Sequence, residues 1–345
     1  MKFTFLITNL NGEISGVLLK CLERIKKLAP INSQIIVCDN GSTDNSIELI
    51  NNFKFEDLKI IQNKKNFGTS HARALATNFI KNEITFILDN DAYLEQIDFD
   101  NIVQTYLNKK NLAIIVPLIL IDKSRKVDYF GDFLTQTGFL KQKHQPLIDF
   151  DDNQKDSFVL AGKGAAFIIR TSFLIEVGGF DPFYHIYVEE TDLAWKCWLK
   201  GKYNITKKKL VVTHGYGSTT RVISKSTFYK NVFFYGPRNY LTMNYTNLEF
   251  LNLIYILPMH FFLWFAFSIY CLLIKFESRR CLYQLWGLLN FLYNIFEINK
   301  KRKKIQKERT VNDKKIFKKF LRKCSLIDFY TKAKRRPKLE SLRDL

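Results

Sequence analysis

The first 90 residues alternate short apolar runs with segments whose apolar residues recur every three or four positions. The short runs predict buried strands, and the periodic segments predict helices. The expected strands are Lys2–Thr8, Gln34–Cys38, Lys59–Gln62 and Ile84–Leu88, and the clearest helices are Glu13–Leu28 and Ser70–Ile80. Strands that alternate with helices favour a mostly parallel sheet with helices on both faces, so the predicted fold class is α/β.

Beyond residue 110 the pattern is less regular, although apolar runs still predict strands at Ala113–Leu120 and Ala165–Ile169. One further segment, Thr191–Lys200, has helical spacing. No Gly/Ser-rich linker and no internal repeat separates these segments from the first half, so we expect one continuous domain. In sheets of this kind ligands bind at the carboxyl ends of the strands.

Two long apolar segments follow this domain. Phe250–Ile274 contains 25 residues without a formal charge, and at about 1.5 Å per residue it is long enough to cross a hydrocarbon core of about 30 Å. Cys281–Ile298 is apolar except for one narrow polar stripe, which favours a helix in the membrane interface or against a partner. We expect residues 246–298 to form membrane-embedded or interfacial helices.

Positive charge is concentrated at the end of the chain. The 345 residues carry a formal net charge of +20, and residues 275–345 hold 22 Lys and Arg against 7 Asp and Glu. Near Asn312, a predicted helix has Ile316 and Phe320 on one face and lysines on the other, which is typical of a basic helix on an anionic membrane surface. Nucleic acid is the competing partner, but no nucleic-acid module is visible, so we expect none. Residues 299–345 are therefore predicted to be a basic tail.

The overall composition is that of a globular protein. Apolar residues make up 47% of the chain and charged residues 25%, which excludes a fibrous or fully disordered protein. The six cysteines show neither CxxC pairs nor metal-ligand spacing, as expected for reduced thiols in a cytoplasmic compartment.

Polar residues gather where the predicted strands of the first half end. They form four groups: Thr8-Asn9, the turn DNGSTD over Asp39–Asp44, Asn66-Phe67-Gly68 before a helix that carries Arg73, and Asp89-Asn90-Asp91. Asp39 at a strand end is suited to accept a hydrogen bond from the imide of a uracil or thymine ring. Taken alone, each group is also explained as an ordinary turn, helix cap or polar loop.

The carboxylates of Asp89 and Asp91 stand one residue apart at the mouth of the predicted sheet. They repel each other, and a divalent cation that bridges them to a diphosphate would relieve the repulsion. Mg²⁺ binds in this way, through one or two carboxylates together with substrate phosphates. An isolated DxD sequence is a weak signal, and a polar loop is the alternative.

The order and spacing of the four groups resemble the family-two glycosyltransferases, enzymes of the GT-A fold that use nucleotide-activated sugars. The resemblance covers about residues 3–245 and is closest to the rhamnosyltransferase-like branch. It continues in downstream segments: Gly162–Ala166, Gly178–Phe183, Val188–Trp195, His214 within VVTHGYGST, and Arg238-Asn239. The implied fold is GT-A, a Rossmann-like and mostly parallel sheet with helices on both faces.

The resemblance implies a role for each matching residue. Four residues would hold the nucleotide: Thr8, Asp39, Asn66 and Arg73. Asp89 would meet the ribose or the metal, Asp91 would ligate Mg²⁺ or Mn²⁺, and His214 would approach the metal or the diphosphate unless it is a core histidine. Arg238, like Arg73, would take up charge that develops on the leaving diphosphate.

The catalytic base would fall at Glu190, where the family often has Asp, and Asp192 is the neighbouring candidate. Together with Glu189 these carboxylates cluster at a predicted helix start. Clustering should raise one pKa, which suits a general base, although complementarity to the helix dipole alone would also place acidic residues there.

The sequence therefore predicts an inverting, metal-dependent glycosyltransferase with its catalytic domain over residues 1–245. The expected donor is a UDP- or dTDP-sugar, and the expected acceptor is a lipid-linked or cell-surface glycan at the cytoplasmic face of a membrane. Two alternatives remain open. A nucleotidyltransferase would need a Gly-rich basic loop after the first strand, where this chain has Asn9–Glu13, and a non-catalytic membrane scaffold would bind nucleotide without turnover.

Overall fold

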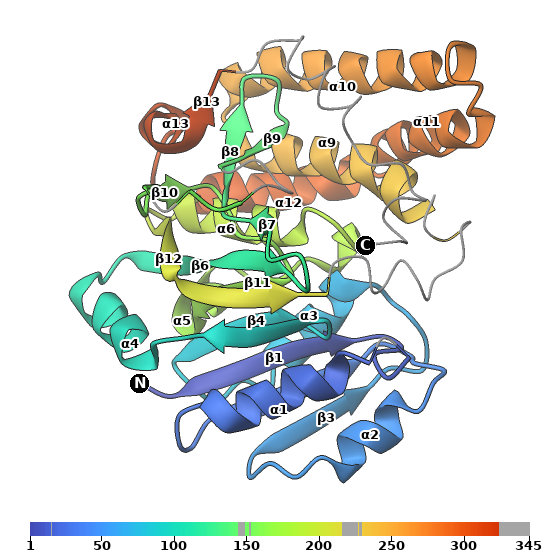
Figure 1. The fold of residues 1–345 in the computed structure, drawn as a ribbon. Helices are drawn as coiled ribbons and strands as arrows, with labels where there is room; N and C mark the ends of the chain where they lie inside the picture. The colour runs from blue at the N-terminus through green and yellow to red at the C-terminus, as the bar shows by residue number, and fades with distance from the viewer. Residues whose placement is uncertain (15, 144–148, 152, 216–226, 228–229, 324–345) are drawn as a thin grey trace.

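A computed structural model describes residues 1–14, 16–143, 149–151, 153–215, 227 and 230–323 (Figure 1). The first quarter of the chain forms a parallel sheet through four strands: β1 (Phe3–Asn9), β2 (Gln34–Asp39), β3 (Leu58–Gln62) and β4 (Ile84–Asp89). The connecting helices are α1 (Leu18–Leu28), α2 (Ser46–Asn52) and α3 (Thr69–Thr77). The strands pair in the order β4-β1-β2-β3, and every residue of β1 is buried.

The second part of the chain extends this sheet beyond β4. It adds β5 (Ala92–Gln96), β6 (Leu112–Ile121), β7 (Val127–Tyr129), β10 (Phe158–Val159), β11 (Ala166–Arg170) and β12 (Tyr203–His214). The path of the sheet is β10-β12-β6-β11-β4-β1-β2-β3. β6 and β12 are parallel to each other, whereas β11 runs antiparallel to both of its neighbours. The predicted α/β fold is confirmed, and these strands belong to one sheet.

Helices cover both faces of the sheet, with α1 in front of it and α3 behind it in the view of Figure 1. The second half contributes α4 (Phe99–Asn108), α5 (Thr171–Glu176), the short 3₁₀ helix η1 (Pro182–Tyr184) and α6 (Glu189–Leu199). Because strands β1, β2 and β4 are parallel, their carboxyl ends meet at one edge of the sheet. The polar groups that end these strands are therefore neighbours.

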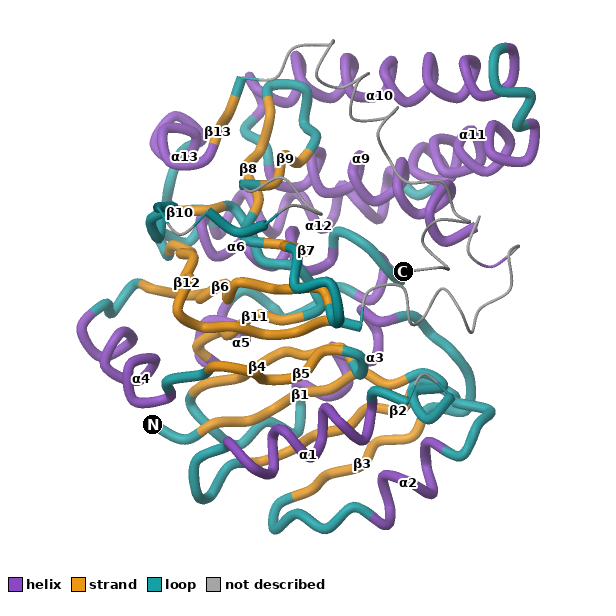
Figure 2. Tube along the Cα trace, in the orientation of Figure 1, coloured by secondary structure: helices purple, strands orange, loops and turns teal. Residues whose placement is uncertain are grey.

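A helical layer stands above the sheet in Figures 1 and 2. It consists of the π-helix η2 (Asn231–Tyr235), α9 (Gly236–Asn247), α10 (Phe250–Leu273), α11 (Ser278–Tyr293), α12 (Ile295–Glu308) and α13 (Asp313–Phe320). A small second sheet of β8 (Asp132–Thr135), β9 (Leu140–Gln142) and β13 (Leu321–Arg322) joins this layer. α11 lies very close to η2: a Cβ atom at Gly287 would come within 2.4 Å of the carbonyl oxygen of Phe234.

The apolar face of α13 is covered by the domain that contains the large sheet. Ile316 and Phe320 are buried in the main core, and the Phe320 ring lies 5.3 Å from that of Trp198 on α6. α12 is tied to the same domain, because Nζ of Lys301 forms an ion pair with Oδ2 of Asp181 over 2.6 Å. The prediction that this amphipathic helix presents its apolar face to a membrane is wrong for residues 313–320, and the rest of the predicted tail, residues 324–345, lies outside the described residues.

α10 is the one helix among the described residues that is long and apolar enough to cross a membrane. It is packed along its length against the protein through one stripe of buried residues: Leu253, Ile256, His260, Ser268 and Cys271. The imidazole Nδ1 of His260 lies 2.8 Å from the carbonyl oxygen of Thr137, in the turn between β8 and β9. The opposite side of α10 exposes large apolar side chains, among them Tyr255 and Phe262.

Candidate active site

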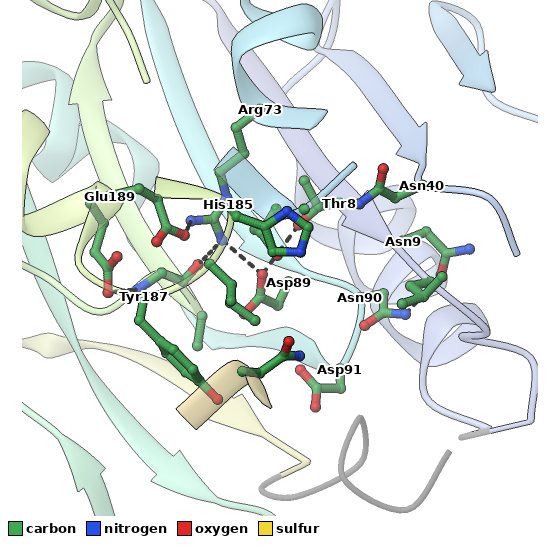
Figure 3. Close-up of a pocket in the computed structure, with 18 of the residues that line it drawn as sticks. Thr8, Asn9, Asn40, Arg73, Asp89, Asn90, Asp91, His185, Tyr187 and Glu189 are labelled. Atoms are coloured by element: carbon green, nitrogen blue, oxygen red, sulfur yellow. Dashed lines mark hydrogen bonds and ion pairs between the residues drawn. The ribbon is translucent and has the colours of Figure 1, made fainter. Parts of the chain in front are cut away.

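A cavity of about 410 Å³ opens where β1 and β4 end (Figure 3). It collects seven of the ten residues that the sequence singled out: Thr8, Asn66, Arg73, Asp89, Asp91, Glu190 and His214. These residues come from segments more than 200 residues apart in the chain, from Thr8 to His214, and the fold brings them to one cavity. The remaining three, Asp39, Asp192 and Arg238, do not line it.

Arg73 is the central link of the cavity wall. It lies on α3, and its guanidinium is 1% exposed. Its Nη2 donates hydrogen bonds to Oδ1 of Asp89 and to the carbonyl oxygen of Gly164, each over 2.7 Å, and its Nη1 donates to Oε1 of Glu189 over 3.1 Å (Figure 3). One buried cation therefore joins the end of β4, the turn before β11 and the start of α6.

Asp89, Asp91 and His214 form a cluster suited to a metal ion. One ligand atom from each of the three side chains lies within 4.8 Å of the others. Burial raises the pKa of Asp89, and the charge of Arg73 opposes this rise only in part. Burial also raises the pKa of Asp91, but the charge and hydrogen bond of His214 outweigh it and hold that pKa below its ordinary value. Two carboxylates and an imidazole are a donor set that fits a divalent cation.

Asp128, which was not among the predicted site residues, orients His214. The imidazole Nδ1 lies 2.7 Å from Oδ2 of Asp128, while Nε2 lies 3.1 Å from Oδ1 of Asp91. Burial lowers the pKa of His214, but the charge of Asp91 and the hydrogen bonds to both carboxylates raise it to about 10. The buried carboxylate of Asp128 also accepts hydrogen bonds of 2.7 and 2.8 Å from Nζ of Lys163, another residue of the cavity wall.

Glu190 reaches the cavity from the first turn of α6. Its Oε1 accepts a hydrogen bond of 3.3 Å from the backbone N–H of Gly164. Its Oε2 is buried and has no hydrogen-bond partner among the described residues. Burial raises the pKa of Glu190, and the nearby charge of Arg73 opposes this. Glu189 also has a buried Oε2 without a hydrogen-bond partner among the described residues, but its Oε1 pairs with the charged guanidinium of Arg73.

Asp39, Asp192 and Arg238 stabilise the surroundings of the cavity instead of lining it. Asp39 is completely buried and accepts hydrogen bonds from the side chain of Asn9 and from the backbone N–H groups of Gly41 and Ser42, so it fixes its own turn. The roles predicted for these three residues toward the substrate stay predictions.

Asp192 and Arg238 are equally committed to contacts within the protein. Asp192 is bound by Nζ of Lys196 at 2.6 Å and by the side-chain amide of Asn247 at 2.8 Å. The Arg238 guanidinium donates to the carbonyl oxygen of Tyr184 over 3.0 Å and lies 4.5 Å above the ring of Phe183.

Further residues of the cavity were missed by the sequence analysis: Asn40, Asn90, His185, Ile186 and Tyr187. The amide groups of Asn40 and Asn90 belong to the predicted polar turns, so proximity to strand ends was a usable signal. His185 lines the cavity because its loop crosses the start of α3. The approach is close: a Cβ atom at Gly68 would lie 2.4 Å from the carbonyl oxygen of His185. Gly68 has a φ of 91°, which favours glycine on conformational grounds as well.

Comparison with known proteins shows which family the first half of the chain is similar to. Residues 4–171 match the family model described as glycosyl transferase family 2. Chondroitin synthase of Pasteurella multocida is 29% identical over 97 residues, which are 28% of this chain and 10% of that protein. The glycosyltransferase GlyG of Streptococcus pneumoniae is 28% identical over 115 residues, 33% of this chain and 38% of that one. The chain thus matches between a tenth and two fifths of the length of these curated relatives.

Two solved structures share the fold over most of their length. TarS 1–349 of S. aureus superposes with a TM-score of 0.54 at 16% identity, covering 84% of this chain and 81% of that chain. Mannosyltransferase PcManGT of Pyrobaculum calidifontis, solved with GDP-Man and Mn²⁺, gives a TM-score of 0.52 at 13% identity, covering 85% and 87%. The rhamnosyltransferase-like branch is not tested by these matches and stays a prediction. The predicted resemblance itself is confirmed: residues 4–171 match the glycosyl transferase family 2 model, and the chain has the GT-A fold of the solved glycosyltransferases.

Proposed function

We propose that the protein transfers a sugar from a UDP- or dTDP-linked donor to an acceptor hydroxyl with inversion at the anomeric carbon. One observation carries this proposal: the metal-binding cluster of Asp89, Asp91 and His214 and the carboxylate of Glu190 line the same cavity. TarS, which is similar in fold, has been solved with UDP-GlcNAc, and PcManGT with GDP-Man and Mn²⁺. Both complexes support a nucleotide-sugar donor for this cavity.

The donor nucleotide would lie over the ends of β1 and β2, among the side chains of Thr8, Asn40 and Asn66. The amide Nδ2 of Asn40 donates to Oδ1 of Asn66 over 2.9 Å, and Oδ1 of Asn66 also accepts from the N–H of Gly68 over 2.8 Å. These contacts hold a row of amide groups at the cavity wall, and amides suit the hydrogen-bonding edge of a base. The buried Asp39 supports this wall from behind.

Asp89, Asp91 and His214 would hold Mg²⁺ or Mn²⁺. When bound, the cation would neutralise charge on the diphosphate of the donor and so favour its departure. Asp128 would keep accepting a hydrogen bond from Nδ1 of His214. On binding of a cation, the proton at Nε2 would be lost, and that nitrogen would then be available as a ligand. Arg73, held against Asp89, adds fixed positive charge to the same wall.

Glu190 would act as the general base. Its raised pKa brings it closer to the working pH than an exposed carboxylate, and its unpartnered Oε2 is available to accept a proton. As Glu190 takes the proton of the acceptor hydroxyl, that oxygen forms the new bond to the anomeric carbon. The bond from this carbon to the diphosphate oxygen breaks on the opposite face, and the electron pair leaves with the nucleoside diphosphate.

Two substitutions test this assignment. Glu190→Gln keeps the size of the side chain but removes the base, so donor binding should persist while transfer falls by roughly 10²–10⁴-fold. Asp91→Asn should abolish metal-dependent transfer. The matched control is Asp57→Asn, which changes a carboxylate paired with Lys81 outside the cavity. Transfer by Glu190→Gln at the wild-type rate would place the base elsewhere, and nucleotide binding by the wild type without turnover would favour a non-catalytic scaffold.

We further propose that residues 246–298 bring the cytoplasmic catalytic domain, residues 1–245, to a lipid-linked or cell-surface glycan acceptor. Support comes from the exposed apolar side chains on α10 and α11, among them Phe262, Leu282 and Leu289. Because one side of α10 is buried against the protein along its length, a helix that lies along the membrane surface fits better than one that crosses it. On this proposal α12 and α13 belong with the catalytic domain.

A further inference from the structure

The loop between η1 and α6 is held in an unfavourable backbone conformation. His185, Tyr187 and Val188 have φ angles of 62°, 69° and 72°, in the left-handed region that non-glycine residues avoid. His185, Ile186 and Tyr187 line the cavity, and the loop leads directly into Glu189 and Glu190. Such a conformation persists only where surrounding contacts enforce it.

Asn239, near the start of α9, supplies one set of these contacts. Its side chain is completely buried. Its Nδ2 donates to the carbonyl oxygens of Tyr184, Ile186 and Tyr187 at 2.8, 2.7 and 2.8 Å, so two protons are shared among three acceptors of the loop. Its Oδ1 accepts from Nε of Arg238 over 2.9 Å, which fixes the orientation of the amide.

Arg238 binds the end of η1, from which the loop begins. Its Nη2 donates to the carbonyl oxygens of Phe183 and Tyr184. Its guanidinium lies 4.5 Å from the ring centre of Phe183 and 4.6 Å from that of Tyr235. The Tyr235 ring in turn stacks on the imidazole of His185, with centres 4.6 Å apart and planes 16° apart.

The loop is also held from its other side. The backbone N–H of Ser70, at the start of α3, donates to the carbonyl oxygen of His185 over 3.0 Å. The strained segment is thus fixed between α3, which carries Arg73, and α9, which carries Arg238 and Asn239. The cavity depends on both attachments because Glu190 follows the last strained residue, Val188, by only two positions.

We infer that Arg238 and Asn239 are positioning residues that hold the loop of residues 183–188 in the conformation that presents Glu190 to the cavity. The inference rests on the proposed function, in which Glu190 is the general base. Neither residue lines the cavity. Without their donors the loop relaxes toward ordinary φ angles, and the first turn of α6 moves with it.

The test compares buried asparagines of the same helix. Asn239→Ala removes the donors, and Asn239→Asp keeps the shape while replacing the donating amide by an acceptor. Because a displacement of about 1 Å at a reacting group costs about 100-fold in rate, kcat should fall by about that factor in both variants, and KM for the donor should change much less. The matched control is Asn244→Ala, whose Nδ2 donates to the carbonyl oxygen of Gly138, away from the loop. This variant should keep the wild-type kcat.

Hydrogen–deuterium exchange of the full chain gives a readout that needs no activity. Amides of residues 183–188 should exchange faster in the Asn239 variants and at the wild-type rate in Asn244→Ala. If an Asn239 variant fails to fold, Arg238→Lys keeps the positive charge but loses the forked donors, and it should show the same pattern in weaker form. Faster exchange when even the wild type turns over no nucleotide sugar would support the positioning role and refute the proposed function. Unchanged exchange together with an unchanged kcat in folded Asn239 variants would overturn the inference.

Discussion

Asp128 shows how a residue that does not line the cavity can tune the metal site. Its carboxylate is buried and accepts a hydrogen bond from Nδ1 of His214. The ammonium group of Lys163 balances the charge of this carboxylate. Partners of this kind typically change metal affinity by 10–100-fold. We predict that Asp128→Asn weakens Mn²⁺ binding by about tenfold or more, measured by calorimetric titration of the purified protein. Asp122→Asn, at the surface end of β6, is the control, and equal affinities of the wild type and Asp128→Asn would contradict the prediction.

The raised pKa of Glu190 predicts a displaced pH profile. A base must be ionised to accept a proton, so the rate of transfer rises with pH through the pKa of Glu190 in the folded protein. Burial holds that pKa above its ordinary value of 4.5. The acid limb of kcat should therefore have its midpoint above 4.5, measured in rapid-quench single turnovers between pH 4 and pH 8. A midpoint at or below the ordinary value would show that another group controls the rate.

The raised pKa values of Glu189 and Glu190 also affect stability, and here the effect weakens as the pH rises. Both Glu189 and Glu190 bind their protons more tightly in the folded than in the unfolded chain, because burial raises both pKa values. Their contribution to the free energy of unfolding is therefore complete below pH 4.5 and falls as the pH rises above it. Replacing both residues by Gln should remove this part of the pH dependence in urea unfolding, and no change in that dependence would contradict the assigned shifts.

At the scale of elements, α13 makes a direct contribution to the core. Phe320 is completely buried against Trp195 and Trp198, so Phe320→Ala should lower the free energy of unfolding by about 3–5 kcal/mol in a urea titration. Lys318→Ala, on the exposed side of the same helix, should stay within about 0.5 kcal/mol of the wild type. A Phe320→Ala protein as stable as the wild type would mean that α13 is not docked in solution.

The elements that the sequence predicted well are those whose own pattern decides their state. The strand predicted over Gln34–Cys38 is observed over Gln34–Asp39, and the helix predicted over Thr191–Lys200 is observed over Glu189–Leu199. The antiparallel direction of β11 could not be predicted from the sequence, because a buried strand has the same apolar pattern in parallel and antiparallel pairs. The face of α13 was misjudged because its partner, Trp198, lies on α6 and is far away in the sequence.

The candidate site was predictable to the same extent. Groups placed at strand ends, such as Thr8 and Asp91, were found because parallel topology brings those ends together. Asp128 was not, because its approach to His214 depends on the pairing of β7 with β6. Arg238 was identified from its motif, which did not indicate the contacts with Tyr184 and Phe183 that tie it to the loop.

For the molecule as a whole, the proposed membrane surface gives a sharp prediction. The side chains of Phe262 and Leu289 are 65% and 63% exposed, so replacing both by Glu should leave the fold intact. Each lost apolar side chain removes up to about 1.5–3 kcal/mol of burial, and binding to vesicles with anionic lipids should weaken at least about tenfold in a sedimentation assay. Leu107→Glu, at an exposed position on α4, is the matched control. Equal sedimentation of the wild type and the double variant would show that α10 and α11 do not contact the membrane through these side chains.

The tight packing of Gly287 against the carbonyl oxygen of Phe234 carries a consequence for energetic linkage. With no room for even a methyl group between α11 and η2, a shift of one helix must displace the other, and η2 ends at the tyrosine that stacks on His185. A lipid surface bound at α11 and a nucleotide sugar bound beside His185 would thus both affect the position of η2. Whatever factor vesicles impose on donor affinity, the donor must impose on vesicle affinity in equal measure, since the two equilibria close a thermodynamic cycle.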